Sequence, residues 1–177
     1  MTSYAAMLRG INVGGHAKVS MADLRTTFAE MGFGAARTYI QSGNVLFATS
    51  TAAAKLRAML EEGLEARFGL GIKVVLRTGP QLAEVVARNP LATGGRDPSK
   101  LHVTFLASKP ATSAPSGLDP RAFLPDEFRV SGREVYVHCP EGYGRTKLNN
   151  AFFERSLDVV ATTRTLRTVT TLADMAR

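Results

Sequence analysis

The sequence predicts an α+β fold made of two ferredoxin-like (split βαβ) subdomains, which arise from an internal duplication and pack into one compact body. Three observations lead to this fold class. Strand-like and helix-like patterns alternate in the order βαββαβ, a similar order returns later in the chain, and two short motifs repeat at a nearly constant distance. We expect the first subdomain at residues 1–88, a linker at 89–100 and the second subdomain at 101–177.

The first half contains four apolar or alternating runs with the length of strands. Two amphipathic patterns lie among them: apolar residues recur at spacings of three and four from Met21 to Met31, and every four residues from Leu56 to Phe68. Ser20 is suited to cap the first of these helices, and Gly79-Pro80 opens a third. The expected strands are residues 4–8, 38–41, 45–48 and 72–77.

The segment "NPLATGGRDPSK" (89–100) contains two prolines and two glycines that break both periodicities, which is typical of a linker. The pattern of the first half then returns. The expected elements are a strand at 101–107, a short helix at 118–124, a hairpin of 128–130 with 135–138, a helix at 147–157, a strand at 160–164 and a last helix at 169–177.

Two motif pairs support a duplication. "QSGNVLF" (41–47) is similar to "VSGREVYV" (130–137), at an offset of 89 from Ser42 to Ser131. "RTGPQLAEV" (77–85) is similar to "RTVTTLADM" (167–175), at an offset of 90 from Arg77 to Arg167. The central strands are apolar on both faces, whereas helices cover only one face of such a sheet. We therefore expect the second face to be buried against the other half.

The composition is that of a soluble globular protein, with 45% hydrophobic and 21% charged residues. No apolar run is long enough to span a membrane, and the N-terminus does not resemble a signal peptide. Cys139 is the single cysteine, which excludes an internal disulfide and fits a cytoplasmic location. The net charge is +7, and both an anionic partner and a merely solvated basic surface account for it.

A glycine-rich turn, "RGINVGGHAK" (9–18), follows the first strand. Gly10 and Gly15 have P-loop spacing, but His16-Ala17 stand where the lysine and hydroxyl of that motif belong, which argues against a P-loop. In the βαββαβ order the "QSGN" turn lies at the end where the first strand exits, so the two turns should be neighbours. The candidate ligand-binding residues here are Arg9, Gly10, Asn12, Gly14, Gly15, Lys18, Gln41, Ser42, Gly43 and Asn44.

A second polar cluster lies in "GYGRTKLNN" (142–150), where the chain enters a helix. The chain also leaves the last strand at this end, so arginines from that exit belong to the same surface. The candidate ligand-binding residues here are Arg145, Lys147, Asn149, Arg164 and Arg167. For both clusters the alternative is an ordinary solvated face whose polar side chains cap the backbone.

The segments "LRGINVGG", "TYIQSGNVLF", "GRTKLNNAFFERSL" and "ATTRTLRTVTTLADMA" resemble a bacterial family catalogued as a domain of unknown function, family 1697. The resemblance spans nearly the whole chain and implies a cytoplasmic protein of two ferredoxin-like subdomains, with no reaction attached. Where many members have Arg-Asn-Trp after the Thr-Thr pair, this chain has Arg164-Thr165-Leu166. A role for that aromatic ring, such as stacking on a base, is therefore not expected here.

The hypothesis that these residues favour is binding of a small anionic ligand, phosphate- or carboxylate-bearing and including nucleotides. Nucleic-acid binding is an alternative based on charge, although the aromatic residues of the central strands, Tyr4, Phe47, Phe105 and Tyr136, are expected in the core.

An enzyme acting on an anionic substrate is a further alternative, and a protein-interaction module is the fourth. His138 and Cys139 are adjacent on a strand and so point to opposite faces, which argues against a nucleophile and base pair. His16 in the glycine loop is a candidate acid or base. The histidines lack metal-ligand spacing, so neither a metal nor a cofactor is predicted. The oligomeric state is not predicted.

Overall fold

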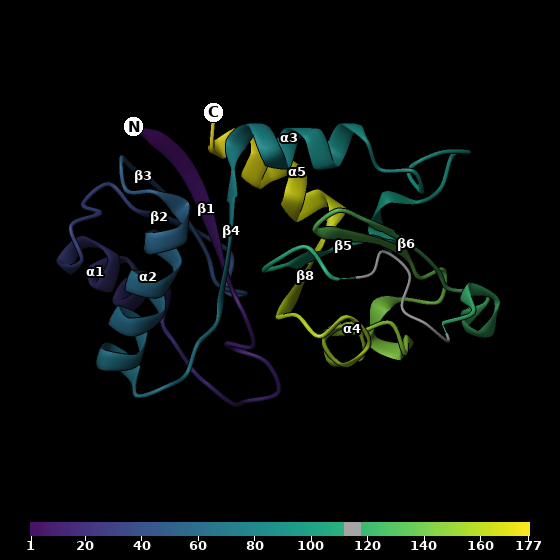
Figure 1. Ribbon diagram of the computed structural model, residues 1–177, viewed down its shortest axis with the longest axis horizontal. Helices are drawn as coiled ribbons and strands as arrows, with labels where there is room; N and C mark the ends of the chain where they lie inside the picture. The colour runs from purple at the N-terminus through teal and green to yellow at the C-terminus, as the bar shows by residue number, and fades with distance from the viewer. Residues whose placement is uncertain (112–117) are drawn as a thin grey trace. The chain divides into compact units, whose positions relative to one another are not determined.

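The computed structural model describes residues 1–111 and 118–177, which form two units. Unit 1 comprises Met1–Leu82 with Leu172–Arg177, and unit 2 comprises Ala83–Thr171. The boundaries fall inside two helices, Gly79–Ala87 and Leu166–Met175, so each of these has residues in both units and is given below with the unit in which it begins. Each unit contains one four-stranded antiparallel sheet with helices (Figure 1). The predicted fold class, two similar α+β subdomains, is therefore confirmed.

Unit 1 has the strand order β2-β3-β1-β4, as a split βαβ unit requires. Figure 1 shows α1 and α2 together on one side of this sheet. Ser20 is the N-cap of α1, and its hydroxyl accepts from the backbone N–H of Asp23 (3.0 Å), as predicted. The elements are β1 (Thr2–Leu8), α1 (Met21–Glu30), β2 (Arg37–Tyr39), β3 (Asn44–Thr49), α2 (Ala53–Phe68), β4 (Val74–Thr78) and α3 (Gly79–Ala87).

Both faces of the unit 1 sheet are buried. On the helix side, Phe28 from α1 and Phe33 pack on Phe47 of β3, with ring centroids 5.3 and 4.8 Å from it. On the other side, Ala5 and Met7 of β1 are also completely buried. The alternation of a strand places these two sets on opposite faces, and the expected burial of the second face against the other half stays a prediction. Packing of the two halves into one body stays a prediction.

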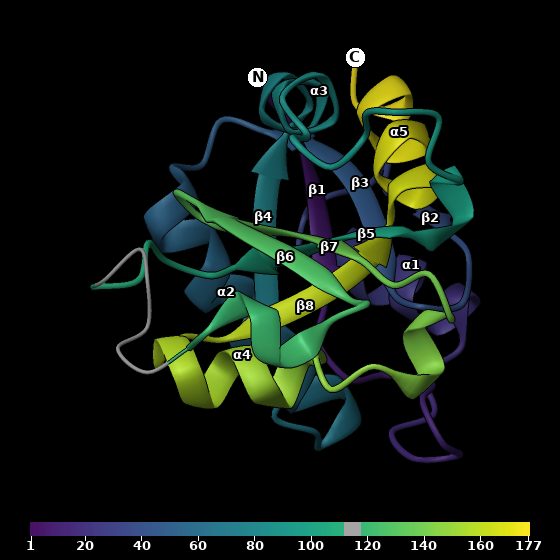
Figure 2. The same ribbon diagram turned by 90° about the vertical axis from the view of Figure 1, so that its right-hand side faces the viewer.

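Unit 2 repeats the strand order, here β6-β7-β5-β8, and α4 packs against β8 (Figure 2). In unit 1 the helix α1 lies between the first two strands of the chain. At the corresponding place in unit 2, between β5 and β6, the described residues contain only one 3-10 turn, η2. The elements are η1 (Pro98–Lys100), β5 (Leu101–Leu106), η2 (Pro120–Phe123), β6 (Glu127–Ser131), β7 (Glu134–His138), η3 (Tyr143–Arg145), α4 (Asn150–Leu157), β8 (Ala161–Thr165) and α5 (Leu166–Met175).

Two helix starts differ from the predicted ones. α4 begins at Asn150 rather than at residue 147, because Asn149 is its N-cap and Lys147 therefore lies in the preceding loop. α5 begins at Leu166 rather than at residue 169, directly after β8. The hydroxyl of Thr165 accepts from the backbone N–H of Thr168 (3.2 Å), which supports this early start.

The second motif match was aligned wrongly. Arg77-Thr78 end β4, and the residues that end β8 in the same way are Arg164-Thr165, not Arg167-Thr168. The guanidinium of Arg77 donates to the carbonyl of Leu76, and that of Arg164 donates to the carbonyl of Thr163 (2.8 and 2.9 Å). The offset in this part of the duplication is therefore 87, because the Arg-Thr pair occurs twice in succession in the second half.

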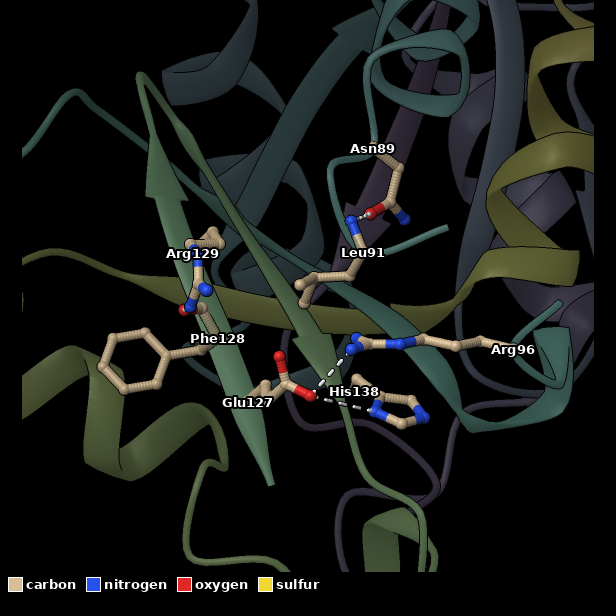
Figure 3. A network of polar contacts seen from close by, with 7 residues as sticks. All are labelled: Asn89, Leu91, Arg96, Glu127, Phe128, Arg129 and His138. Atoms are coloured by element: carbon tan, nitrogen blue, oxygen red, sulfur yellow. Dashed lines mark hydrogen bonds and ion pairs between the residues drawn. The ribbon is translucent and has the colours of Figure 1, made fainter. Parts of the chain in front are cut away.

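The segment 89–100 is irregular but anchored within unit 2 (Figure 3). The side-chain oxygen of Asn89 accepts from the backbone N–H of Leu91 (2.9 Å), and Leu91 is buried. Arg96 forms an ion pair with Glu127 of β6 (2.8 Å). The first contact is internal to the segment, and the second joins it to the sheet of unit 2; its role as a linker stays a prediction.

Candidate functional site

The glycine loop and the "QSGN" turn of unit 1 are neighbours, as the topology predicted. The backbone N–H of Leu8 donates to the carbonyl of Gly43 (2.8 Å), and the side-chain amide of Asn12 donates to the carbonyl of Gln41 (2.8 Å). Gly10, Gly14 and Gly15 all have positive φ, which glycine adopts without strain. The glycines therefore serve the geometry of the turn.

The side-chain amides of the two asparagines on this surface form hydrogen bonds within the protein. Asn12 donates to the carbonyl of Val19 as well as to that of Gln41, and its oxygen accepts from the N–H of Val19 (2.9 Å each for the Val19 bonds). Asn44 is fully buried and donates to the carbonyl of Tyr39 and the hydroxyl of Ser42 (3.0 Å each). Both amides stabilise the turns, which leaves little of them for a ligand.

Two polar side chains of the glycine loop face solvent. His16 and Lys18 are exposed, and neither forms a hydrogen bond or ion pair through its side chain with the residues that the structure describes. Gln41 is also exposed, whereas Arg9 and Ser42 are half-buried. This surface therefore offers one exposed lysine and one exposed histidine around a turn.

The asparagines of the second cluster are structural too. Asn149 caps α4 by accepting from the N–H of Phe152 (3.0 Å). Asn150 accepts from the hydroxyl of Thr163 (2.6 Å), which in turn lies 2.7 Å from the hydroxyl of Thr104. This chain of hydrogen bonds ties α4 to β8 and β5, and it explains why two asparagines occur at a helix start.

The two arginines of the strand exit have different environments. Arg164 is 7% exposed, and its guanidinium donates to the hydroxyl of Thr162 (2.8 Å). Burial lowers the pKa of Arg164 to about 10, so it is still charged at neutral pH. Arg167 is exposed on the first turn of α5. Of the five candidate residues of this cluster, only Arg145 and Lys147 line the cleft described next; Asn149, Arg164 and Arg167 do not.

Arg145 and Lys147 both line one cleft of unit 2, with a volume of about 170 Å³. Both side chains are exposed, and within residues 1–111 and 118–177 neither has a hydrogen-bond or ion-pair partner. The remaining lining residues are Ala122, Phe123, Leu124, Pro125, Asp126, Glu141 and Gly142. The cleft therefore combines two cations, two carboxylates and an apolar wall.

A short chain of hydrogen bonds joins two of the segments that line this cleft. The hydroxyl of Thr146 donates to Oδ2 of Asp126 (2.6 Å) and accepts from the backbone N–H of Leu148 (3.0 Å). Thr146 thereby joins the segment after η2 to the segment that carries Arg145 and Lys147. Sequence reasoning missed Asp126, since residues 122–126 show no periodicity and only the fold brings them to the basic segment. It also missed Glu141, although this residue directly precedes the segment 142–150 in the sequence.

The environment of Cys139, the single cysteine, does not favour a role as a catalytic nucleophile. Cys139 is buried in the core below α4, and this burial raises the pKa of its thiol. His138 lies on the opposite face, where its Nδ1 is 3.9 Å from Oε1 of Glu127, the oxygen that also pairs with Arg96 (Figure 3). His138 and Cys139 therefore do not form a catalytic pair, as predicted.

His102 is a buried histidine, and its titration should make the free energy of unfolding depend on pH. It is 6% exposed and stacks on the ring of Tyr143, with centroids 4.7 Å apart. Burial lowers its pKa, so below the ordinary value of about 6.5 the unfolded chain takes up a proton that the folded chain does not.

We expect the free energy of unfolding to fall as the pH drops below about 6.5, because the unfolded chain then binds more protons at this position than the folded chain does. His102→Phe keeps a ring against Tyr143 but cannot titrate, so this part of the slope should vanish. Urea unfolding of both proteins between pH 5 and 7.5 measures it. Equal slopes in the two proteins would contradict the assignment.

The aromatic residues needed for base stacking are inside the protein. Tyr4, Phe47, Phe105 and Tyr136 are each at most 8% exposed, as predicted for core residues. A platform of the RNA-recognition type requires such rings on an open sheet face. Nucleic-acid binding is therefore supported only by net charge.

The described residues include neither a candidate membrane span nor a candidate metal site. No helix among them combines the length and apolar character needed to cross a bilayer. In the same part of the chain, no three or more His, Cys, Asp or Glu side chains are grouped so that they could hold a metal ion.

Comparison with known proteins identifies the family. Residues 1–136 match the family described as protein of unknown function (DUF1697), so the chain belongs to it. A conserved bacterial protein of Streptococcus pneumoniae, SP0830, has a similar structure, with a TM-score of 0.72, 24% identity and 99% of each chain covered. This similarity shows the fold. No curated protein matches the sequence.

Proposed function

We propose that this DUF1697 protein binds a small ligand through a carboxylate or phosphate group, in the cleft of unit 2 that Arg145 and Lys147 line. The observation that carries the proposal is that two cations without protein partners among the described residues share one cavity. Hydrogen bonds from a charged donor contribute about 1.5–3 kcal/mol each, and arginine suits planar, bidentate contact with these anions. The two side chains are therefore available for an anion.

The size of the cleft restricts the ligand. Its volume of about 170 Å³ is below the range of roughly 300–1,000 Å³ that is usual for pockets enclosing drug-sized ligands. A whole nucleotide would extend far beyond it. The cleft therefore favours a molecule of the size of an amino acid or a short-chain phosphate.

Arg145→Ala and Lys147→Ala should each weaken binding at least tenfold, because each removes one charge-assisted contact worth about 1.4 kcal/mol or more. Isothermal titration with small carboxylates and phosphates measures the affinity. Because both side chains are exposed, the melting temperature should change by less than about 2 °C.

Two variants serve as controls. Arg155→Ala removes an exposed arginine from the same unit outside the cleft, and it should leave binding unchanged. Lys18→Ala tests the glycine loop of unit 1. Loss of binding in Lys18→Ala, with normal binding in Arg145→Ala and Lys147→Ala, would assign the anion to the glycine loop. It would refute the proposal that the cleft of unit 2 is the binding site.

A further inference from the structure

Positive and negative side chains line the cleft of unit 2 in equal number. Arg145 and Lys147 carry positive charge, and Asp126 and Glu141 carry negative charge. Charges of the same sign within one small cleft repel each other, and the protein beside them screens this repulsion less than water does. A ligand with only negative charge would therefore lose near the carboxylates much of what it gains near the cations.

The four charged groups do not neutralise one another. No ion pair within 4.0 Å joins the two cations to the two carboxylates, although all four line the same cavity. Glu141 is exposed and has no partner among the described residues. Asp126 accepts from Thr146 through Oδ2, which fixes the carboxylate and leaves Oδ1 without a donor among the described residues. Both carboxylates can therefore accept from a ligand.

An apolar wall completes the lining. Phe123, Leu124 and Pro125 contribute it, and Leu124 is 65% exposed, which is unusual for a large apolar side chain in this protein. Phe123 is held in place, because its ring packs edge-on against those of Phe128 and Phe152 (5.8 and 5.1 Å). The wall thus offers a fixed ring and an accessible leucine beside the charges.

We propose that the ligand of this cleft is amphoteric: a small molecule that carries one carboxylate or phosphate and one ammonium group on a short apolar part. This inference rests on the proposed function, which supplies the anionic contact through Arg145 and Lys147. Its new content is that Glu141 and Asp126 receive the ammonium group, while residues 123–125 contact the apolar part. Free amino acids and aminoalkyl phosphates have this chemistry.

Matched probes separate the two charges. Leucine, 4-methylpentanoate and 3-methylbutylamine share one apolar part and carry both charges, the negative charge only, or the positive charge only. Phosphoethanolamine and ethyl phosphate form the corresponding phosphate pair. Isothermal titration at pH 7 should show each amphoteric probe binding at least tenfold more tightly than its purely anionic counterpart, and the better pair identifies the anionic group.

Glu141→Gln should abolish this preference, reducing the affinity for the amphoteric probe to that for the anion. Asp126→Asn, which keeps an oxygen that can accept from Thr146, should also reduce the preference for the amphoteric probe over the anion. Glu62→Gln changes an exposed carboxylate of α2 in unit 1 and is the matched control. Equal affinities for both members of each pair, or an unchanged preference in Glu141→Gln, would overturn the inference and leave the proposed function standing. No binding of any probe would overturn both.

Discussion

Gly43→Ala is expected to destabilise unit 1 by about 2–5 kcal/mol, because it combines backbone strain with overpacking. Gly43 has φ +80°, a conformation that costs a residue with a Cβ about 1–2 kcal/mol. A Cβ there would lie 2.5 Å from Cδ1 and 2.9 Å from Cγ1 of Ile11, and 3.1 Å from Cβ of Leu8. Leu8 is almost fixed, because its backbone N–H donates to the Gly43 carbonyl.

The duplication provides a matched control in Gly132, which occupies the corresponding hairpin turn of unit 2. Its φ is +60°, but a Cβ there would meet nothing closer than 3.9 Å. Gly132→Ala should therefore cost only about 1–2 kcal/mol, from the backbone alone. Urea unfolding followed by circular dichroism measures both losses.

Ile11→Val tests the cause of the difference, since it removes Cδ1, the atom nearest to the added methyl group. In the background of Ile11→Val, the loss caused by Gly43→Ala should shrink by about 1 kcal/mol, as a double-mutant cycle measures it. Equal losses at Gly43 and Gly132 would show that only backbone strain matters and that the contact with Ile11 does not.

The fold was predictable because its signals are local. Strands and helices follow from the periodicity of apolar residues, and the repeated order of elements indicates two similar units. The errors occurred where a single polar side chain decides a boundary. Asn149 caps α4 and moves its start to Asn150, and the repeated Arg-Thr pairs after Thr163 allowed an alignment that only the ends of β4 and β8 correct.

The candidate site was predictable only in part, for a different reason. Arg145 and Lys147 stand out in the sequence because they precede a helix in a polar segment. Asp126 lies about twenty residues earlier, and its link to that segment is one hydrogen bond from Thr146. No spacing rule encodes such a contact, since it depends on how the segment after η2 returns to the sheet.

The glycine loop shows the converse case, in which polar residues with the pattern of a binding site are structural. Asn12 is the decisive residue, with φ +55° and three side-chain hydrogen bonds to Val19 and Gln41. Asparagine tolerates this φ better than most residues do. Its amide therefore joins two turns that lie about thirty residues apart in the sequence.

Asn12→Ala is expected to cost about 4 kcal/mol, from three hydrogen bonds worth about 1 kcal/mol each and about 1 kcal/mol for the strain of alanine at positive φ. Asn12→Gly loses the same hydrogen bonds without that strain, so it should be about 1 kcal/mol more stable than Asn12→Ala. Asn12→Asp keeps the acceptor for the Val19 N–H but sets a carboxylate against the carbonyls of Val19 and Gln41.

Lys18→Ala is the control within the same loop, and because Lys18 is exposed it should change stability by less than about 0.5 kcal/mol. Urea unfolding and ligand titration on the same four variants separate the two roles of the loop. A large loss of stability in Asn12→Ala, with ligand affinity kept, means that the loop exists to join the turns. Unchanged stability with lost affinity would instead make Asn12 a ligand contact and return the binding site to unit 1.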